Sequence, residues 1–212
     1  YKGSEKQADG SLLVKGGDKG DIETVLVLCA IGRVPNTMAL GLREAGVMLD
    51  NDGAVVVDAH NRTNVASIYA VGDVTNRVQL TPVAIREGHA FADSVFGNNP
   101  RTIDYGCIPT AVFSNPPIAS VGLTEEEART KLSDVKVYRS DFRAMKNVLA
   151  GRNERALYKM IVDGDTDKVV GPDSGEILQA AAIAVKAGLT KQAFDDTVAL
   201  HPSMAEELVL MK

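Results

Sequence analysis

The sequence predicts an α/β segment followed by an α+β domain, and three observations indicate this fold class. A continuous apolar run at residues 24–31 has the length and β-branched content of a strand buried on both faces. Residues 81–96 show the apolar spacing of a helix, which a Gly-Asn-Asn-Pro turn ends. After Pro100, short strands alternate with well-capped helices, as in an antiparallel sheet with helices on one face. We therefore place a domain boundary near Pro100 and Arg101.

Size and charge exclude several classes of protein. The 212 residues exceed the need of one small domain, and 45% hydrophobic with 24% charged residues is the balance of a globular chain. Lys and Arg number 23 against 28 Asp and Glu, with no basic run, so nucleic acid is not an expected partner. The longest apolar stretches, such as residues 25–31 and 180–185, are far too short to cross a bilayer, so no membrane association is expected.

The two cysteines, Cys29 and Cys107, are far apart, and neither belongs to a C-x-x-C motif or stands beside a second metal-type ligand. We expect two reduced, mostly buried thiols, a cytoplasmic location and no metal site. The chain begins at Tyr1 without an initiator Met and shows no signal peptide. This start predicts that the sequence is a portion of a longer protein.

Short local patterns define the other elements of the first hundred residues. The apolar run ends at the breaker cluster 32–36, and Gly46 would end the short helix that follows. Thr81 is the expected N-cap of the helix at 81–96, with Pro82 in its first turn. The remaining elements are a strand at 12–15, a helix at 38–45, and strands at 54–57 and 67–71. The apolar stripe of the long helix is expected to include Ala84, Phe91 and Val95.

The second half contains three clear strand patterns and three helix starts. The strands are predicted at 110–114, 135–140 and 156–162. The helix starts are capping boxes, formed by Thr124 with Glu127, Asp173 with Glu176, and Ser203 with Glu206. A further strand from Lys168 is cut short at Gly171, so the strand at 156–162 has only half a partner. Either this truncation is real or a few residues are missing there.

A possible ligand site follows the strand at 67–71. Gly72 and Asp73 would stand at its carboxyl end, where open α/β sheets bind ligands, and the carboxylate can accept hydrogen bonds from ligand hydroxyls. The helix starting near Leu80 and Thr81 would direct free N–H groups at a negative ligand group. From spacing alone, Asp73 also fits a turn aspartate that caps the next loop, and Thr81 also fits a simple helix cap.

A second possible site lies near the C-terminus. Of the three histidines, His60 lies in a polar loop, whereas His201 directly precedes a proline and a capping box. Glu206 has two available roles: it can satisfy the Ser203 backbone as part of that box, or it can accept a hydrogen bond from the His201 ring. The second role would keep the imidazole basic near neutral pH, as an acid–base catalyst requires.

Five motifs in a fixed order add a family resemblance. They are A-I-G-R-V-P-N at 30–36, I-Y-A-V-G-D at 68–73, L-T-P-V-A at 80–84, F-S-N-P-P-I-A-S-V-G-L-T-E at 113–125 and H-P-S-M-A-E-E-L-V at 201–209. Together they resemble the C-terminal half of the FAD-dependent pyridine-nucleotide disulfide oxidoreductases, and among these the glutathione reductases most closely. The resemblance covers nearly the whole chain from Thr24. No single motif is decisive, but five in this order are very improbable by chance.

This resemblance implies parts of three domains. Residues 1–35 are similar to the tail of an NADPH-binding domain, 36–100 to the second segment of a split FAD-binding domain, and 101–212 to the α+β interface domain through which the family dimerises. It further implies a homodimeric enzyme that uses NADPH and FAD to reduce glutathione disulfide to two glutathiones. Hydride passes from NADPH to the flavin, electrons pass to a cysteine pair, and the dithiol reduces the substrate.

Site residues are also implied by the resemblance. Gly72 and Asp73 match the place where the family binds the ribityl chain of FAD, and Leu80 and Thr81 match the backbone beside the flavin pyrimidine edge. Reduced flavin carries negative charge there, which a helix N-terminus stabilises.

The C-terminal motif carries the catalytic roles that the resemblance implies. His201 matches the acid–base histidine, which serves the cysteines of the partner subunit, and Glu206 matches the carboxylate that orients it. The bond between His201 and Pro202 is expected to be cis, as it usually is in the family.

Three departures from the family pattern limit this assignment. The redox-active cysteine pair and the N-terminal G-x-G-x-x-G are absent, so Cys29 and Cys107 receive no redox role. The isolated chain is therefore expected to be a non-catalytic dimerisation fragment. The family continues the strand that matches residues 169–171, which favours missing residues at that point. His89 stands where glutathione reductases often have an arginine that contacts a substrate carboxylate, and it is a weaker anion partner near pH 7.

The substrate assignment therefore has alternatives within the family. Trypanothione reductase is the nearest, because residues 98–104 are similar in character to its sequence. Dihydrolipoyl dehydrogenase is a poorer match, because Ala199 stands where that enzyme tends to have a second histidine.

Overall fold

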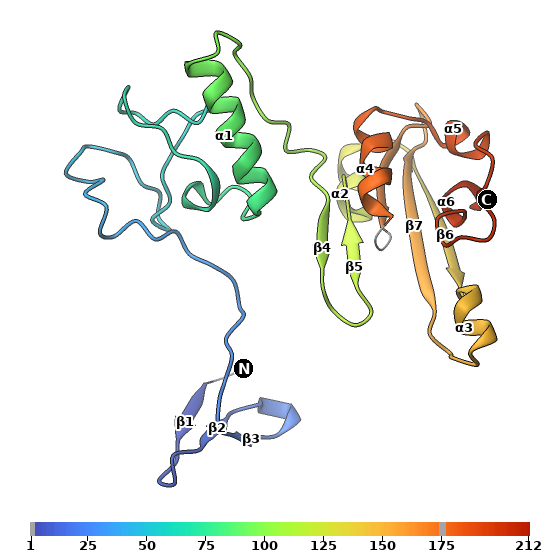
Figure 1. Cartoon of the computed structure of the whole chain (residues 1–212), viewed down its shortest axis with the longest axis horizontal. Coiled ribbons are helices and arrows are strands. Elements are labelled where there is room, and N and C mark those ends of the chain that lie inside the picture. Colours follow the sequence, from blue (N-terminus) through green and yellow to red (C-terminus); the bar gives the residue numbers. More distant parts are fainter. Residues whose placement is uncertain (1–2, 174–176) are drawn as a thin grey trace. The chain divides into compact units, whose positions relative to one another are not determined.

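The computed structural model describes residues 3–173 and 177–212. The chain forms two compact units, Tyr1–Arg101 and Thr102–Lys212, and each is described by itself (Figure 1). No helix in the described ranges is both long enough and apolar enough to cross a membrane. The further division of the first unit at residue 35 stays a prediction.

The first unit begins with a small antiparallel sheet of three strands in the order β1-β2-β3. Its strands are β1 (Ser4–Lys6), β2 (Leu12–Val14) and β3 (Ile22–Thr24). The short 3-10 helix η1 (Gly17–Lys19) connects the last two. The strand predicted at 12–15 is therefore present as β2.

The predicted strand at 24–31 is wrong, because β3 ends at Thr24 and the apolar run continues as an exposed segment. Val25 is 86% exposed and Leu28 is 89% exposed. A strand buried on both faces requires neighbouring strands and covering helices, and the described residues of this chain provide neither here. For the same reason Cys29 is exposed rather than buried, whereas Cys107 is partly buried.

Other short elements predicted for the first unit are reduced to turns and single bridges. Residues 38–45 form turns instead of a helix. The strands predicted at 54–57 and 67–71 each contribute one isolated antiparallel bridge, Leu49 with Val55 and Arg62 with Tyr69. Segments of three or four residues gain too few hydrogen bonds to form a regular ladder without a longer partner.

The long helix is confirmed as α1 (Thr81–Val95), preceded by the 3-10 helix η2 (Gly72–Thr75). Two details of the prediction are wrong. The N-cap position is Leu80, which makes no side-chain cap, and Thr81 is already helical. The buried positions of α1 are Val83, Glu87 and Ala90, and η2 packs against this helix.

The second unit contains an antiparallel sheet of five strands in the order β4-β5-β8-β7-β6, as the α+β prediction requires (Figure 1). Its strands are β4 (Thr110–Val112), β5 (Ile118–Ser120), β6 (Val135–Phe142), β7 (Ala156–Asp163) and β8 (Val169–Asp173). β8 extends through Pro172 to Asp173, beyond the predicted end at Gly171, and its register against β7 shifts between Ile161 and Val162.

In the part of the second unit that the structure describes, the helices are α2 (Glu125–Lys131), α3 (Met145–Leu149), α4 (Leu178–Lys186), α5 (Lys191–Asp195) and α6 (Glu207–Leu210). The capping box of Thr124 and Glu127 is confirmed at α2. Because the Glu127 carboxylate accepts the Thr124 backbone N–H, the pKa of Glu127 is lowered. The box predicted for Asp173 with Glu176 lies outside the described residues.

The core of the second unit is built on β7. Its alternate residues Tyr158, Met160 and Val162 share one buried cluster with α4 and the C-terminal segment. Ile161 points to the opposite face of β7 and is only 1% exposed. Helix α2 contacts β6 and β7, and its residue Ala128 is fully buried. The second face of β7 is therefore covered near Ile161, whereas Leu157 on the same face stays 62% exposed. The other members of the cluster in α4 to Met211 are Leu178, Ala181, Ala182, Val185, Phe194, Leu208 and Met211.

Candidate functional site

Gly72, the first predicted site residue, is buried and has a positive φ of 75°. A Cβ atom at this position would lie 2.8 Å from the Cβ of Ala84 on α1. Glycine is therefore required twice, for the left-handed backbone and for the close approach of η2 to the helix. The sequence anticipated a close approach at this glycine, but to a ligand rather than to a helix.

Replacing Gly72 by alanine should lower the free energy of unfolding of the chain by about 1–3 kcal/mol more than the same change at Gly46 does. Gly46 has a φ of 76°, but its added Cβ would meet nothing within 4 Å. The two variants share the cost of a positive φ, so their difference isolates the contact with Ala84. Urea denaturation measures both, and equal destabilisation would contradict the packing argument.

Asp73 follows on the surface of η2, where its side chain is 47% exposed. Its carbonyl oxygen accepts the N–H of Asn76 at 3.0 Å, which fixes the backbone, and one carboxylate oxygen lies 3.5 Å from Nε of Arg33. The side chain is therefore accessible on a well-held turn. This arrangement leaves the carboxylate able to accept hydrogen bonds from a ligand.

Leu80 and Thr81 lie at the start of α1. The Leu80 carbonyl accepts the N–H groups of Val83 and Ala84 at 2.9 and 3.1 Å, whereas within the described residues the Thr81 N–H has no acceptor. The first turn contains no acidic side chain. This 15-residue helix therefore begins with a free donor and an uncompensated positive dipole end, which suits a negative ligand group.

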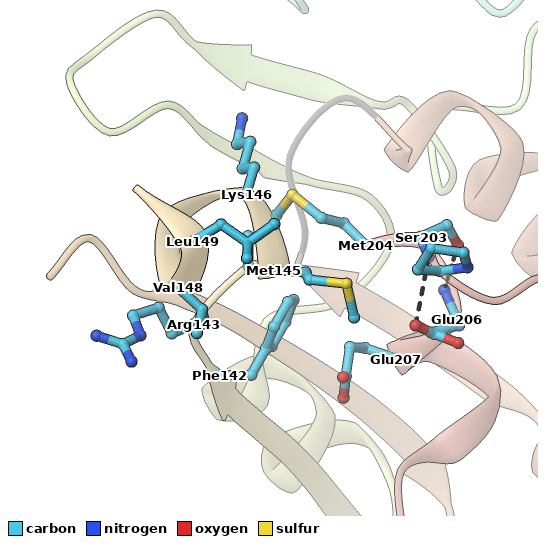
Figure 2. Close-up of a pocket in the computed structure, with 12 residues that line it drawn as sticks. Phe142, Arg143, Met145, Lys146, Val148, Leu149, Ser203, Met204, Glu206 and Glu207 are labelled. Atoms are coloured by element: carbon cyan, nitrogen blue, oxygen red, sulfur yellow. Dashed lines mark hydrogen bonds between the residues drawn. The ribbon is translucent and has the colours of Figure 1, made fainter. Parts of the chain in front are cut away.

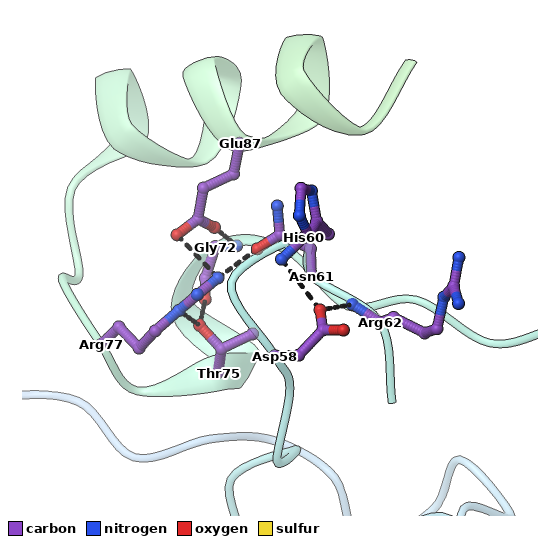
Figure 3. Close-up of polar contacts among 8 residues, drawn as sticks. All are labelled: Asp58, His60, Asn61, Arg62, Gly72, Thr75, Arg77 and Glu87. Carbon is purple, nitrogen blue, oxygen red and sulfur yellow. Dashed lines mark hydrogen bonds and ion pairs between the residues drawn. The ribbon is translucent and has the colours of Figure 1, made fainter. Parts of the chain in front are cut away.

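Behind this surface lies a buried polar network that the sequence prediction missed (Figure 3). Glu87 of α1 is 1% exposed, and its carboxylate contacts both the Gly72 N–H and the Arg77 side chain. Its position was detectable, since it lies four residues after Val83 and three before Ala90. A carboxylate at helical spacing between two apolar positions indicates a buried, paired charge.

The C-terminal site brings His201 and Glu206 together. Nδ1 of His201 lies 3.1 and 3.0 Å from the two carboxylate oxygens of Glu206. The histidine side chain is 70% exposed and the glutamate only 13%. A largely buried carboxylate thus contacts Nδ1 of an exposed ring, and Nε2 of that ring is directed away from the carboxylate.

Glu206 also performs its capping role. Its Oε1 accepts the Ser203 N–H at 3.3 Å, and its own N–H donates to the Ser203 hydroxyl at 3.2 Å. This reciprocal pair forms in the turn before α6, whose first helical residue is Glu207. Both available roles are therefore filled at once, because the carboxylate serves the histidine ring and the backbone together. The His201–Pro202 bond is cis, as expected, and so is Asn115–Pro116, which was not anticipated.

An open pocket of about 620 Å³ lies beside this segment, between α3 and residues 202–207 (Figure 2). Met145 and Met204 line it from its two sides, and Arg143 and Lys146 add positive charge. Glu207 lines it as well and accepts a hydrogen bond from the Ser140 hydroxyl of β6 at 2.6 Å. Burial raises the pKa of the Tyr158 hydroxyl on β7, and the negative charge of Glu207 raises it further. This pocket could not be predicted from the sequence, because α3 is distant from residues 202–207 along the chain.

Lys191 fixes the segment that carries His201. Its side chain is 4% exposed, pairs with Asp195 one turn later in α5, and donates to the Met211 carbonyl at 2.9 Å. The ammonium also lies 4.5 Å from the centre of the Tyr138 ring. One buried cation therefore joins the two ends of the stretch that contains His201 and Glu206.

The two groups of site residues lie in different units, Gly72 to Thr81 in the first and His201 with Glu206 in the second. His60 and His89 are exposed and belong to neither group. Among the described residues, no group of three or more His, Cys, Asp or Glu side chains could hold a metal ion.

Two family models match nearly the whole chain. Residues 108–212 match the dimerisation domain of the pyridine nucleotide-disulphide oxidoreductases, and residues 1–88 match the model described as pyridine nucleotide-disulphide oxidoreductase. Among solved structures, the HOCl-induced flavoprotein disulfide reductase RclA from Escherichia coli matches with a TM-score of 0.84 and 28% identity. The match covers 97% of this chain and 48% of that one.

Curated relatives are more similar in sequence. Glutathione reductase of Burkholderia cepacia is 50% identical over 90% of this chain and 44% of its own length. The chloroplastic/mitochondrial glutathione reductase of Pisum sativum is 48% identical over 98% of this chain and 38% of its own, and that of a Nostoc species is 50% identical over 94% and 47%. The chain thus spans less than half the length of these relatives.

Proposed function

The chain belongs to the pyridine nucleotide-disulphide oxidoreductase family, and on that basis we propose that it is the C-terminal portion of an NADPH-dependent glutathione-disulfide reductase. The overall reaction would convert glutathione disulfide, NADPH and a proton into two glutathiones and NADP⁺. The observation that carries the proposal is the pairing of His201 with Glu206 at 3.0 Å, in a chain about half identical to three glutathione reductases.

His201 would act as the acid–base catalyst. When a cysteine thiolate attacks the disulfide, a cysteine–glutathione mixed disulfide forms, the glutathione sulfur–sulfur bond breaks, and the departing glutathione thiolate needs a proton. Attack of the second cysteine on the mixed disulfide would then release the second glutathione and restore the cysteine disulfide. The exposed Nε2 of His201 can donate that proton and later recover one from the second cysteine of the pair. The family resemblance implies that this histidine serves the cysteine pair of the partner subunit, and we place His201 in that active site.

Glu206 is the positioning residue in this scheme. Its carboxylate accepts from Nδ1, which assigns the proton-bearing nitrogen and leaves Nε2 for the reaction. Its bonds with the Ser203 backbone restrict the carboxylate in turn. The Ser203 backbone thus restrains the Glu206 carboxylate, and the carboxylate restrains the His201 ring. This restraint supports a catalytic role for His201 over that of a merely solvated side chain.

Residues at the start of α1 fit FAD. Asp73 presents a half-exposed carboxylate to accept from ribityl hydroxyls, Gly72 lets η2 lie close to α1, and the region of Leu80 and Thr81 offers a free N–H at a positive helix end. When bound, FAD would supply the relay of electrons from NADPH to the cysteine pair. The Thr81 N–H and the positive dipole end of α1 would stabilise negative charge on the group bound there.

The proposal extends to assembly and location. Residues 101–212 would form the interface of a homodimer, residues 36–100 the second segment of the FAD domain and residues 1–35 the tail of the NADPH domain. Exposed apolar side chains of the second unit, such as Phe113 at 94% exposure, support an interface in that domain. The two cysteines are free in the structure, which supports a reducing compartment such as the cytoplasm.

The isolated chain should bind no stable FAD and reduce no disulfide, because it lacks the dinucleotide fingerprint and the redox cysteines. Gel filtration of the 212-residue chain with added FAD, followed by an absorbance scan, measures this. Flavin absorbance that co-elutes with the protein would contradict the expectation.

In the intact protein, turnover with NADPH should be fastest with glutathione disulfide. Trypanothione disulfide and lipoamide are the comparison substrates, since His89 stands where an arginine often meets a glutathione carboxylate. Initial rates of NADPH oxidation give kcat/KM for each substrate. A higher value for trypanothione disulfide or lipoamide would replace the glutathione assignment by that member of the family.

A further inference from the structure

The buried carboxylate of Glu87 holds the backbone of Gly72 directly (Figure 3). Oε2 accepts the Gly72 N–H at 2.5 Å, and Oε1 accepts from Nη2 of Arg77 at 3.1 Å. Glu87 is 1% exposed, whereas Arg77 keeps 26% of its side chain accessible. The ion pair therefore lies at the edge of the core with its anionic end inside.

Arg77 and Thr75 close this network from the other side. Nη2 of Arg77 also donates to Oδ1 of Asn61, and Nε reaches the Thr75 hydroxyl at 3.4 Å. That hydroxyl donates to the Gly72 carbonyl at 2.8 Å. Both backbone polar groups of Gly72 are thus held by side chains, the N–H by Glu87 and the carbonyl by Thr75.

The location of this network points to a role beyond stability. A buried ion pair adds little net stability over apolar side chains of similar volume, because desolvation offsets the attraction between the charges. It does impose one geometry on the groups it contacts. Here those groups are a glycine at a φ of 75° and, directly after it, the accessible Asp73.

The same side chain couples the two halves of the proposed FAD site. Glu87 lies on α1, which begins at Leu80 and Thr81. Its carboxylate accepts the N–H of Gly72, the residue before Asp73. Contact between Gly72 and Ala84 brings η2 against the same helix. The hydrogen bond between Glu87 of α1 and Gly72 of η2 therefore fixes the position of the Asp73 carboxylate relative to the free N–H at the start of α1.

We propose that Glu87 is a positioning residue for FAD, which fixes Gly72 and Asp73 against the N-terminus of α1 before the cofactor binds. The inference rests on the proposed function, because it presumes that FAD binds at Asp73. Preorganisation of this kind lowers the ordering cost of binding. Loss of the carboxylate should consequently weaken FAD binding in protein that is still folded.

The test uses the intact flavoprotein and FAD itself as the probe. Glu87→Leu should raise the dissociation constant of FAD about 100-fold, since it removes a charge-assisted hydrogen bond and leaves the Gly72 N–H without its acceptor. Glu87→Gln keeps an acceptor oxygen for that N–H, so it should recover binding to within about 10-fold of wild type. Asp93→Asn is the matched control, because Asp93 is on the same helix but pairs with Arg101 at the surface.

FAD binding is measured by the fluorescence of released flavin, at temperatures where far-UV circular dichroism shows each variant folded. Thr75→Val serves as a second variant that preserves volume, and it should weaken binding about 10-fold by releasing the Gly72 carbonyl. If Glu87→Leu and Thr75→Val bind FAD as tightly as wild type, this inference is overturned while the proposed function stands. If the wild-type intact protein binds no FAD, the proposed function falls and this inference falls with it.

Discussion

Replacing His201 by alanine in the intact protein should lower the turnover of glutathione disulfide by about 100- to 10,000-fold while NADPH still reduces the flavin at the wild-type rate. This range is what a positioned acid–base group contributes. The two rates should respond differently because, in the proposed mechanism, His201 would protonate the departing thiolate and would take no part in hydride transfer. Its side chain is 70% exposed, so its removal should cost little stability.

Stopped-flow absorbance of the flavin measures the reductive half-reaction, and steady-state NADPH oxidation measures the whole cycle. His60→Ala is the matched control, because His60 is also exposed and belongs to neither site. Glu206→Gln should fall between wild type and His201→Ala, since it keeps a hydrogen bond to Nδ1 but loses the charge. Unchanged turnover in His201→Ala would refute the catalytic role, and a slowed flavin reduction would point to misfolding instead.

Replacing Lys191 by methionine should lower the free energy of unfolding by about 3 kcal/mol, because it removes one partner of a buried ion pair. Methionine fills the volume of the aliphatic stem, so the loss is electrostatic. The Met211 carbonyl, which accepts from Nζ at 2.9 Å, and the Asp195 carboxylate both lose their donor. The stretch that carries His201 would be released from α5 at the same time.

Chemical denaturation of the intact protein measures the change. Lys186→Met is the matched control, because its pair with Asp104 is well exposed at both ends and should be worth less than about 1 kcal/mol. The double variant Lys191→Met with Asp195→Leu should regain part of the loss, since no uncompensated carboxylate remains. If Lys191→Met destabilises no more than Lys186→Met, the buried ammonium is not the anchor of this segment.

Local patterns predicted the elements that depend only on their own residues. The capping box of Thr124 with Glu127, the helix α1 and the strands β6 and β7 all appear where the sequence placed them. The exposed run at 25–31 shows the opposite case. Its composition is that of a buried strand, but a strand requires partners from elsewhere in the fold, and local composition carries no information about whether they are present.

The candidate sites likewise contain one contact that local sequence predicts and one that it does not. His201 and Glu206 are five residues apart, so their contact could be anticipated from spacing and from the capping box that joins them. The contact of Glu87 with Gly72 spans fifteen residues and two elements, and no spacing rule connects a helix interior to the turn before it. Only the packing of η2 on α1 reveals that contact.

The sequence by itself determined the family, the antiparallel α+β class of the second unit and the pairing of His201 with Glu206, because each depends on short segments whose residue types are sufficient evidence. The tertiary structure alone decided which apolar segments are covered, that Glu87 holds Gly72, and that Lys191 secures the stretch with His201. Those features depend on contacts between side chains of different elements. Burial strengthens hydrogen bonds and ion pairs in such contacts, and the local sequence does not encode which contacts form.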